Sequence, residues 1–156
     1  MMDWINTLGM LVVLLMLLPN IVYAFRYKGA ENRCHSVVMN LIEQVGRYGS
    51  MFLLSFNIGV AENGFSSKTA FVVWLLSMGV LMLGYWIGWL FYFRKPLPVL
   101  ALVLAILPSL MFLLSGILQR HWLLLLTAML FTAGHIYVTV CNAWATTGSH
   151  GGGNVG

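Results

Sequence analysis

The residues best suited to chemistry lie inside one hydrophobic stretch, where Glu43 and Arg47 stand four positions apart. This spacing puts a carboxylate and a guanidinium on one face of a helix, with the acid on the N-terminal side, which is the favourable order. A charge at the centre of a bilayer costs roughly 3 kcal/mol or more, so ionisable residues in membrane helices normally face the protein interior and find a partner. Glu43 and Arg47 are therefore predicted to pair and to mark a polar site.

Other helices are predicted to bring polar residues to the same depth. At a rise of about 1.5 Å per residue, Asn20, the Glu43–Arg47 pair and His135 all fall in the half of the bilayer nearest the loops around Arg26 and Arg94. Because an imidazole changes charge near physiological pH, His135 could carry a proton or act as a base. The predicted ligand-binding set, placed in a pocket of the inner leaflet, comprises Asn20, Glu43, Gln44, Arg47, Tyr48, His135 and Tyr137.

Each of these residues also has a purely structural interpretation. Glu43 and Arg47 could form an ion pair that only fixes helix packing, and His135 could be a neutral ring bonded across helices. Asn20 could be an interhelical hydrogen-bonding residue, and Thr132 could bond back to its own helix. No metal site is expected, because Cys34, His35, His135 and Cys141 lack a ligand spacing. No catalytic motif is legible, so catalytic residues and cofactors stay unknown.

The elements that must position these residues are five transmembrane helices. The chain is 60% hydrophobic and only 8% charged, far below the charged content of soluble domains. Its apolar runs reach the ~20 residues that cross a bilayer. The sequence predicts an all-α, polytopic integral membrane protein with one domain over residues 1–145, and Gly84-x-x-x-Gly88 predicts a close helix contact, within one chain or between two. The expected helices cover 4–25, 37–61, 69–93, 99–119 and 122–144, followed by a flexible glycine-rich tail over 146–156.

Loop charges predict the orientation of the bundle in the cell membrane. Five Lys and Arg residues lie in the loops on one side of the predicted bundle and two on the other. Because positive residues favour the cytoplasmic side, the N-terminus is predicted outside and the C-terminus inside. The net charge of +4 is attributed to this bias and not to nucleic-acid binding. Both cysteines fall on the predicted cytoplasmic side, where reduced thiols are expected.

Three function classes fit these features. The first is a small transporter or ligand-binding membrane protein, whose small size favours a homo-oligomer and whose ligand would be a small molecule or a lipid. The second is an accessory or assembly subunit that packs against a partner membrane protein. The third is a membrane-embedded enzyme acting on a lipid-like substrate, although the sequence favours a role without catalysis.

Overall fold

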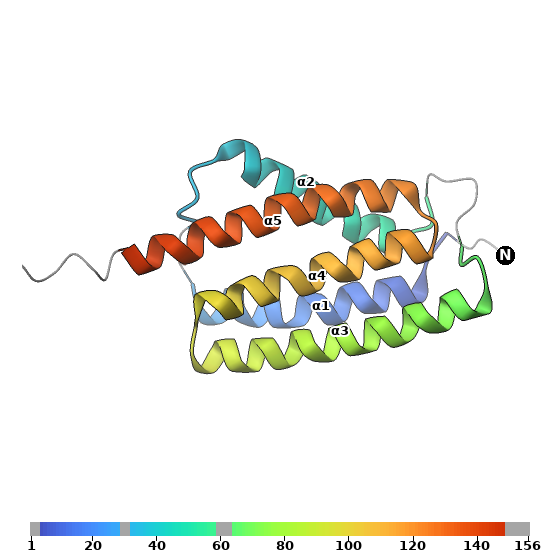
Figure 1. Ribbon diagram of the computed structural model, residues 1–156, viewed down its shortest axis with the longest axis horizontal. Coiled ribbons are helices and arrows are strands. Elements are labelled where there is room, and N and C mark those ends of the chain that lie inside the picture. The colour runs from blue at the N-terminus through green and yellow to red at the C-terminus, as the bar shows by residue number, and fades with distance from the viewer. Residues whose placement is uncertain (1–3, 29–31, 59–63, 149–156) are drawn as a thin grey trace, which may run out of the picture.

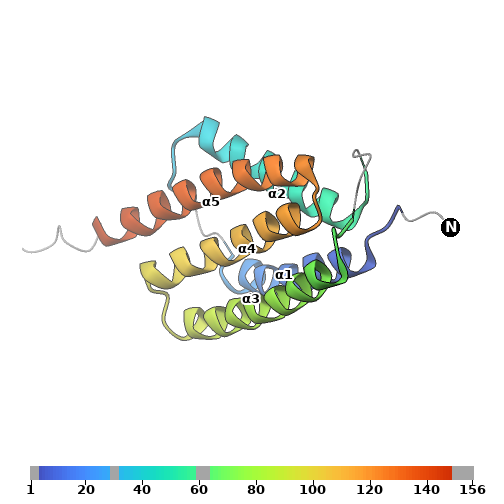
Figure 2. The same ribbon diagram turned by 45° about the vertical axis from the view of Figure 1, so that its right-hand side comes forward.

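The computed structural model describes residues 4–28, 32–58 and 64–148, with the backbone alone for 146–148. Five α-helices make up most of this part of the chain (Figure 1). Helices that follow one another in sequence run in opposite directions (Figures 1 and 2). The helices are α1 (Thr7–Arg26), α2 (Val37–Ser55), α3 (Lys68–Arg94), α4 (Pro98–Leu118) and α5 (Trp122–Gly148).

Polar residues or proline set the first residue of each helix. Asn6, Ser36 and Ser67 accept a backbone N–H from the first turn of α1, α2 and α3, respectively. Pro98 opens α4, where its missing N–H is not needed. His121 caps α5, because its Nδ1 accepts the backbone N–H of Leu124 at 3.2 Å.

Two boundaries of the first two helices differ from the prediction, because the segments before α1 and after α2 pair with each other. α2 ends at Ser55 and not at Ala61, and α1 begins at Thr7 and not at Trp4. The chain beyond Ser55 is extended, and the backbone N–H of Asn57 donates to the carbonyl of Trp4 at 2.9 Å. The backbone N–H of Asn6 donates to the carbonyl of Ser55 at the same distance. Asn57 therefore lies outside α2, although the expected helix over 37–61 would have included it.

The last helix is longer than predicted. α5 continues to Gly148, four residues past the expected end at Trp144, so the first part of the predicted tail is helical. The remaining tail, 149–156, lies outside the described residues.

The packing is centred on α5, which lies between α2 and α4 and contacts both extensively (Figures 1 and 2). α3 packs on α4, and α1 packs on α2 and α3. A Cβ added at Gly88 would lie 3.0 Å from Leu104 on α4, and one at Gly84 would lie 3.9 Å from Leu107. The glycine pair therefore forms a contact between α3 and α4 of the same chain.

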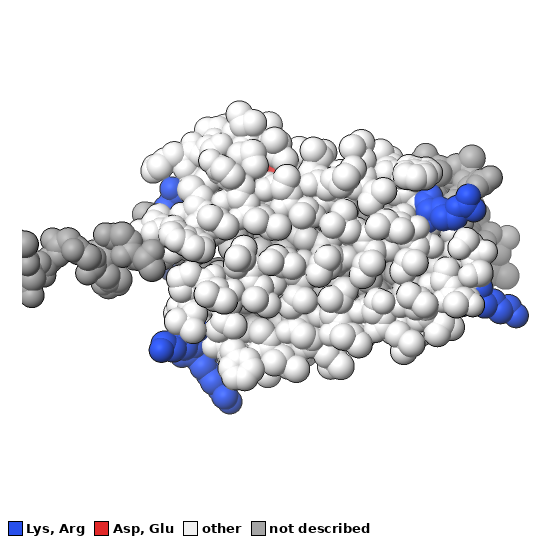
Figure 3. All heavy atoms as spheres, in the orientation of Figure 1, with Lys and Arg blue, Asp and Glu red and all other residues white. Residues whose placement is uncertain are grey.

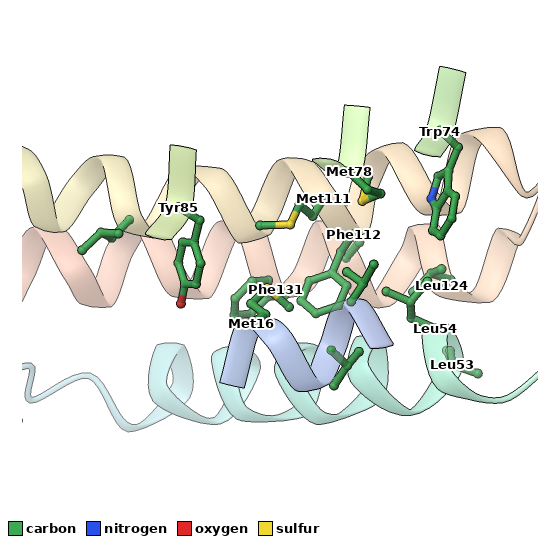
Figure 4. Close-up of a cluster of buried hydrophobic side chains, with 14 of the residues drawn as sticks. Met16, Leu53, Leu54, Trp74, Met78, Tyr85, Met111, Phe112, Leu124 and Phe131 are labelled. Carbon is green, nitrogen blue, oxygen red and sulfur yellow. The ribbon is translucent and has the colours of Figure 1, made fainter. Parts of the chain in front are cut away.

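Large apolar side chains fill the centre of the bundle (Figure 4). Met16, Leu54, Phe112 and Leu124 are all almost fully buried. Trp74 joins them, and its indole N–H donates to the Ser115 hydroxyl at 2.9 Å, which satisfies the polar atom of a buried ring.

Four of the helices, α1, α3, α4 and α5, are long and apolar enough to cross a membrane. On the face shown in Figure 3, Lys and Arg lie at the two ends, and the band between them shows only a small trace of an acidic side chain. These features indicate a membrane protein. α2 lies outside this set of four, and it is the helix that carries Glu43 and Arg47.

Candidate functional site

Glu43 is a buried carboxylate at the contact between α2 and α5. Its side chain is only 6% exposed. Its Oε1 accepts a hydrogen bond from Nη2 of Arg47, one turn further along α2, and lies 2.7 Å from Nδ1 of His135 on α5. Because an ionised carboxylate only accepts hydrogen bonds, Nδ1 of His135 carries a proton, and in the neutral form of the ring Nε2 keeps a lone pair. The structure thus brings together Glu43, Arg47 and His135, three members of the predicted ligand-binding set.

Two glycines allow this approach of the helices. A Cβ at Gly134 would lie 2.6 Å from the backbone nitrogen of Glu43, and a Cβ at Gly46 would overlap the backbone of Phe131. Both glycines adjoin a member of the site, next to His135 and Arg47. They were missed in the sequence, although a glycine beside an ionisable residue in an apolar helix is the signal that could have identified them.

Arg47 is the least enclosed member of the site. Its side chain is 32% exposed, and Glu43 is the only hydrogen-bond partner of its guanidinium among the described residues. A guanidinium has five N–H donors, so most of them face no acceptor from this part of the chain. Arg47 lies ten residues into α2, or about 15 Å from its start.

Asn20 is linked to Glu43, Arg47 and His135 by way of Tyr85, a residue outside the predicted ligand-binding set. The Asn20 side-chain amide donates to the Tyr85 hydroxyl at 2.8 Å and to the carbonyl of Met16 at 2.9 Å. Tyr85 extends from α3 into the interior, with its hydroxyl at the inner tip (Figure 4), and lies within Coulomb range of Arg47. We use the name polar cluster for Asn20, Glu43, Arg47, Tyr85 and His135, which come from α1, α2, α3 and α5.

Three predicted residues lie apart from the polar cluster. Gln44 and Tyr48 are exposed on the outward face of α2. Tyr137 is 49% exposed and lines an apolar groove of about 720 Å³ between α4 and α5. A second apolar groove, of about 340 Å³, lies between α1 and α3. Neither groove includes a member of the polar cluster, so neither is the expected inner-leaflet pocket.

Two other polar residues of α5, Thr132 and Asn142, make structural contacts. The Thr132 hydroxyl donates to the carbonyl of Ala128 at 2.7 Å, within its own helix. Asn142 accepts the backbone N–H of Arg33 at 2.8 Å and donates to the Asn32 side chain at 3.1 Å. Asn142 thus ties the segment before α2 to the last part of α5.

A second polar group lies at the opposite end of the bundle, around the turn between α4 and α5. The Asn6 side-chain amide donates to Oε1 of Gln119 at 3.1 Å. Nε2 of Gln119 and Nε2 of His121 are buried without a hydrogen-bond partner among the described residues. Burial lowers the pKa of His121, because desolvation disfavours the imidazolium.

Comparisons with protein-family models, curated proteins and solved structures found no match to this chain. Its function is therefore inferred from the polar cluster itself.

Proposed function

We propose that the protein crosses the cell membrane five times, with α2 as the fifth span, its N-terminus outside and its C-terminus in the cytoplasm. The alternating helix directions support this arrangement (Figure 1). α2 has 19 residues, so at about 1.5 Å per residue it is close to the ~30 Å thickness of a hydrocarbon core. Its charged pair turns toward α5, as expected for a helix surrounded by lipid.

We further propose that the protein is a small transporter or ligand-binding membrane protein, and that the polar cluster is its binding site. The observation that carries this proposal is Arg47, a partly exposed guanidinium most of whose donors have no acceptor among the described residues. Glu43, which also bonds to His135, holds the guanidinium on one side only. A ligand that supplies oxygen acceptors would complete its hydrogen bonds.

Native mass spectrometry of the protein purified from membranes tests this function, because it detects a bound molecule of any identity by its mass. The wild type is expected to carry a bound small molecule or lipid that is lost in Arg47→Ala and in Glu43→Gln. Gln44→Ala is the matched control, because Gln44 adjoins Glu43 but is exposed on the outward face of α2. Identical bound masses in the wild type and both cluster variants would rule the proposal out.

A role as an accessory subunit is the second candidate, and it is favoured by the outward face of α2. Gln44 and Tyr48 are exposed one turn apart, at a depth where a lipid offers their polar atoms no partner. A photo-crosslinking residue at Gln44 should then capture a stoichiometric partner protein or a second copy of this chain. Crosslinks to lipid alone would dismiss this candidate and leave the first in place.

A further inference from the structure

Two kinds of polar group in the polar cluster have no partner among the described residues. The Arg47 guanidinium has N–H donors that no described residue accepts. His135 is 21% exposed, and its Nε2 has no partner among the described residues because Nδ1 makes the bond to Glu43. A site with unused donors and one basic nitrogen is suited to a ligand that brings negative charge.

The charge of the polar cluster limits what can bind there. The charges of Glu43 and Arg47 cancel when His135 is neutral, so the five residues of the polar cluster together carry no net charge. An added anion would leave one uncompensated negative charge in a poorly solvated site, which is costly. Protonation of His135 at Nε2 would restore neutrality, and imidazole is the side chain that gains a proton most readily near neutral pH.

We propose that the polar cluster binds a ligand through one oxyanion group, a carboxylate or a phosphate, and that each bound anion brings one proton onto Nε2 of His135. The proton comes from bulk water, and the Nδ1 proton stays in the hydrogen bond to Glu43. This inference rests on the binding function proposed above and names its ligand chemistry and its coupling to pH.

The groups that face His135 agree with a single coupled proton. Glu43 from α2 bonds to Nδ1 of His135 and also holds Arg47, and the ring of Phe131, one turn earlier on α5, stacks on the imidazole with 4.7 Å between centroids. Tyr85 from α3 lies within Coulomb range of Arg47. α1 contributes the amide of Asn20, which does not titrate. α4 packs against α5 but contains no Asp, Glu, His, Lys, Arg or Tyr. His135 is therefore the only imidazole in the polar cluster, which makes it the acceptor that we assign to the coupled proton.

Linkage makes the coupling measurable. If one proton binds with each anion, affinity falls about tenfold for each pH unit above the titration midpoint of His135. By the same reciprocity, a saturating anion moves that midpoint to higher pH.

Nuclear magnetic resonance of the ¹⁵N-labelled histidines, with the full chain in phosphatidylcholine nanodiscs, tests the inference directly. Benzoate is the soluble probe in one arm, and partial replacement of phosphatidylcholine by phosphatidylglycerol is the lipid probe in the other. We expect the His135 midpoint to rise by about one pH unit or more in at least one arm, and Arg47→Gln to remove the rise. His121, at the opposite end of the bundle, is the internal reference, and Arg94→Gln, at the exposed end of α3, is the matched control.

The outcomes separate the ligand source and the two proposals. A rise with benzoate identifies a free oxyanion, and a rise only with phosphatidylglycerol identifies a lipid headgroup. An unmoved midpoint in both arms overturns the proton coupling. The binding function is tested separately, by whether Arg47→Ala loses the bound molecule in native mass spectrometry. An unmoved His135 midpoint would therefore overturn the proton coupling without overturning the binding function.

Discussion

Gln44 follows Glu43 directly in sequence, yet its side chain is exposed and that of Glu43 is buried. Successive helical residues differ by about 100° around the axis. Residues at one depth can therefore face opposite ways. Spacing alone could predict that Glu43 meets Arg47, and depth could bring in His135. Neither could show which way α5 is rotated, so Tyr137, two residues past His135, was placed in the same site although it faces an apolar groove.

His121 is the residue whose protonation should affect stability. Its pKa is lowered by burial, and its Nδ1 caps α5 only while unprotonated. Below about pH 6.5 the unfolded chain binds a proton that the folded chain resists. As the pH falls below about 6.5, protonation of the unfolded chain at His121 therefore lowers the stability of the fold. Above that pH His121 is unprotonated in both states and does not change the stability. We expect the melting temperature in detergent to fall less between about pH 8 and about pH 5 in His121→Asn than in the wild type.

The control for this prediction is His35→Asn. His35 is exposed in the segment before α2, so this variant should keep the pH dependence of the wild type. Asparagine at position 121 still caps the helix, which keeps loss of the cap from obscuring the result. If the melting temperatures of His121→Asn and the wild type fell equally with pH, the folded state would not resist protonation of His121.

At the scale of elements, the contact between α2 and α5 depends on the absence of side chains. A Cβ at Gly46 would overlap the backbone of Phe131, whereas one at Gly79 on α3 would meet nothing within 4 Å. We expect Gly46→Ala to destabilise the protein by about 1–3 kcal/mol, because the two helices would have to separate. Gly79→Ala should instead stabilise it by about 0.5–1 kcal/mol. Unfolding by sodium dodecyl sulfate in mixed micelles measures both, and a shift in the same direction would contradict this packing of α2 on α5.

The two cysteines report on the other end of the same contact. Cys141 interacts with Cys34, and the neighbouring Asn142 bonds to the backbone of Arg33 at 2.8 Å. Diamide should therefore oxidise the pair to a disulfide within one chain. Loss of both sites for a maleimide label would measure this, and Cys34→Ser should leave Cys141 free to react. A chain that keeps both thiols after oxidation would show that the segment before α2 does not rest on α5.

The end of α2 shows where sequence patterns stop being informative. The apolar pattern continues past Ser55, so nothing local marks a boundary there. The helix stops because residues 55–57 pair with residues 4–6, a contact between distant parts of the chain. Caps such as Ser36 and breakers such as Pro98 are local, which is why the starts of α2 and α4 were predicted to within one residue.

At the scale of the whole molecule, the number of spans decides where the two ends of the chain lie. Five crossings put the termini on opposite sides of the membrane, whereas four crossings, with α2 on the surface, would put them on the same side. We expect an N-terminal alkaline phosphatase fusion to be active outside the cell and a C-terminal green fluorescent protein fusion to fluoresce inside. Both reporters indicating the same side would remove α2 from the bilayer and with it the proposed site.

The long sequence separation between Glu43 and His135 has a consequence for biosynthesis. The two residues are 92 positions apart. At the usual elongation rates of about 5–20 residues per second, translation of the intervening chain takes roughly 5–18 s. During that interval α2 has left the ribosome while its main packing partner has not been made. The Glu43 carboxylate then lacks its hydrogen bond to His135, so the nascent chain is most vulnerable to quality-control proteases before α5 arrives.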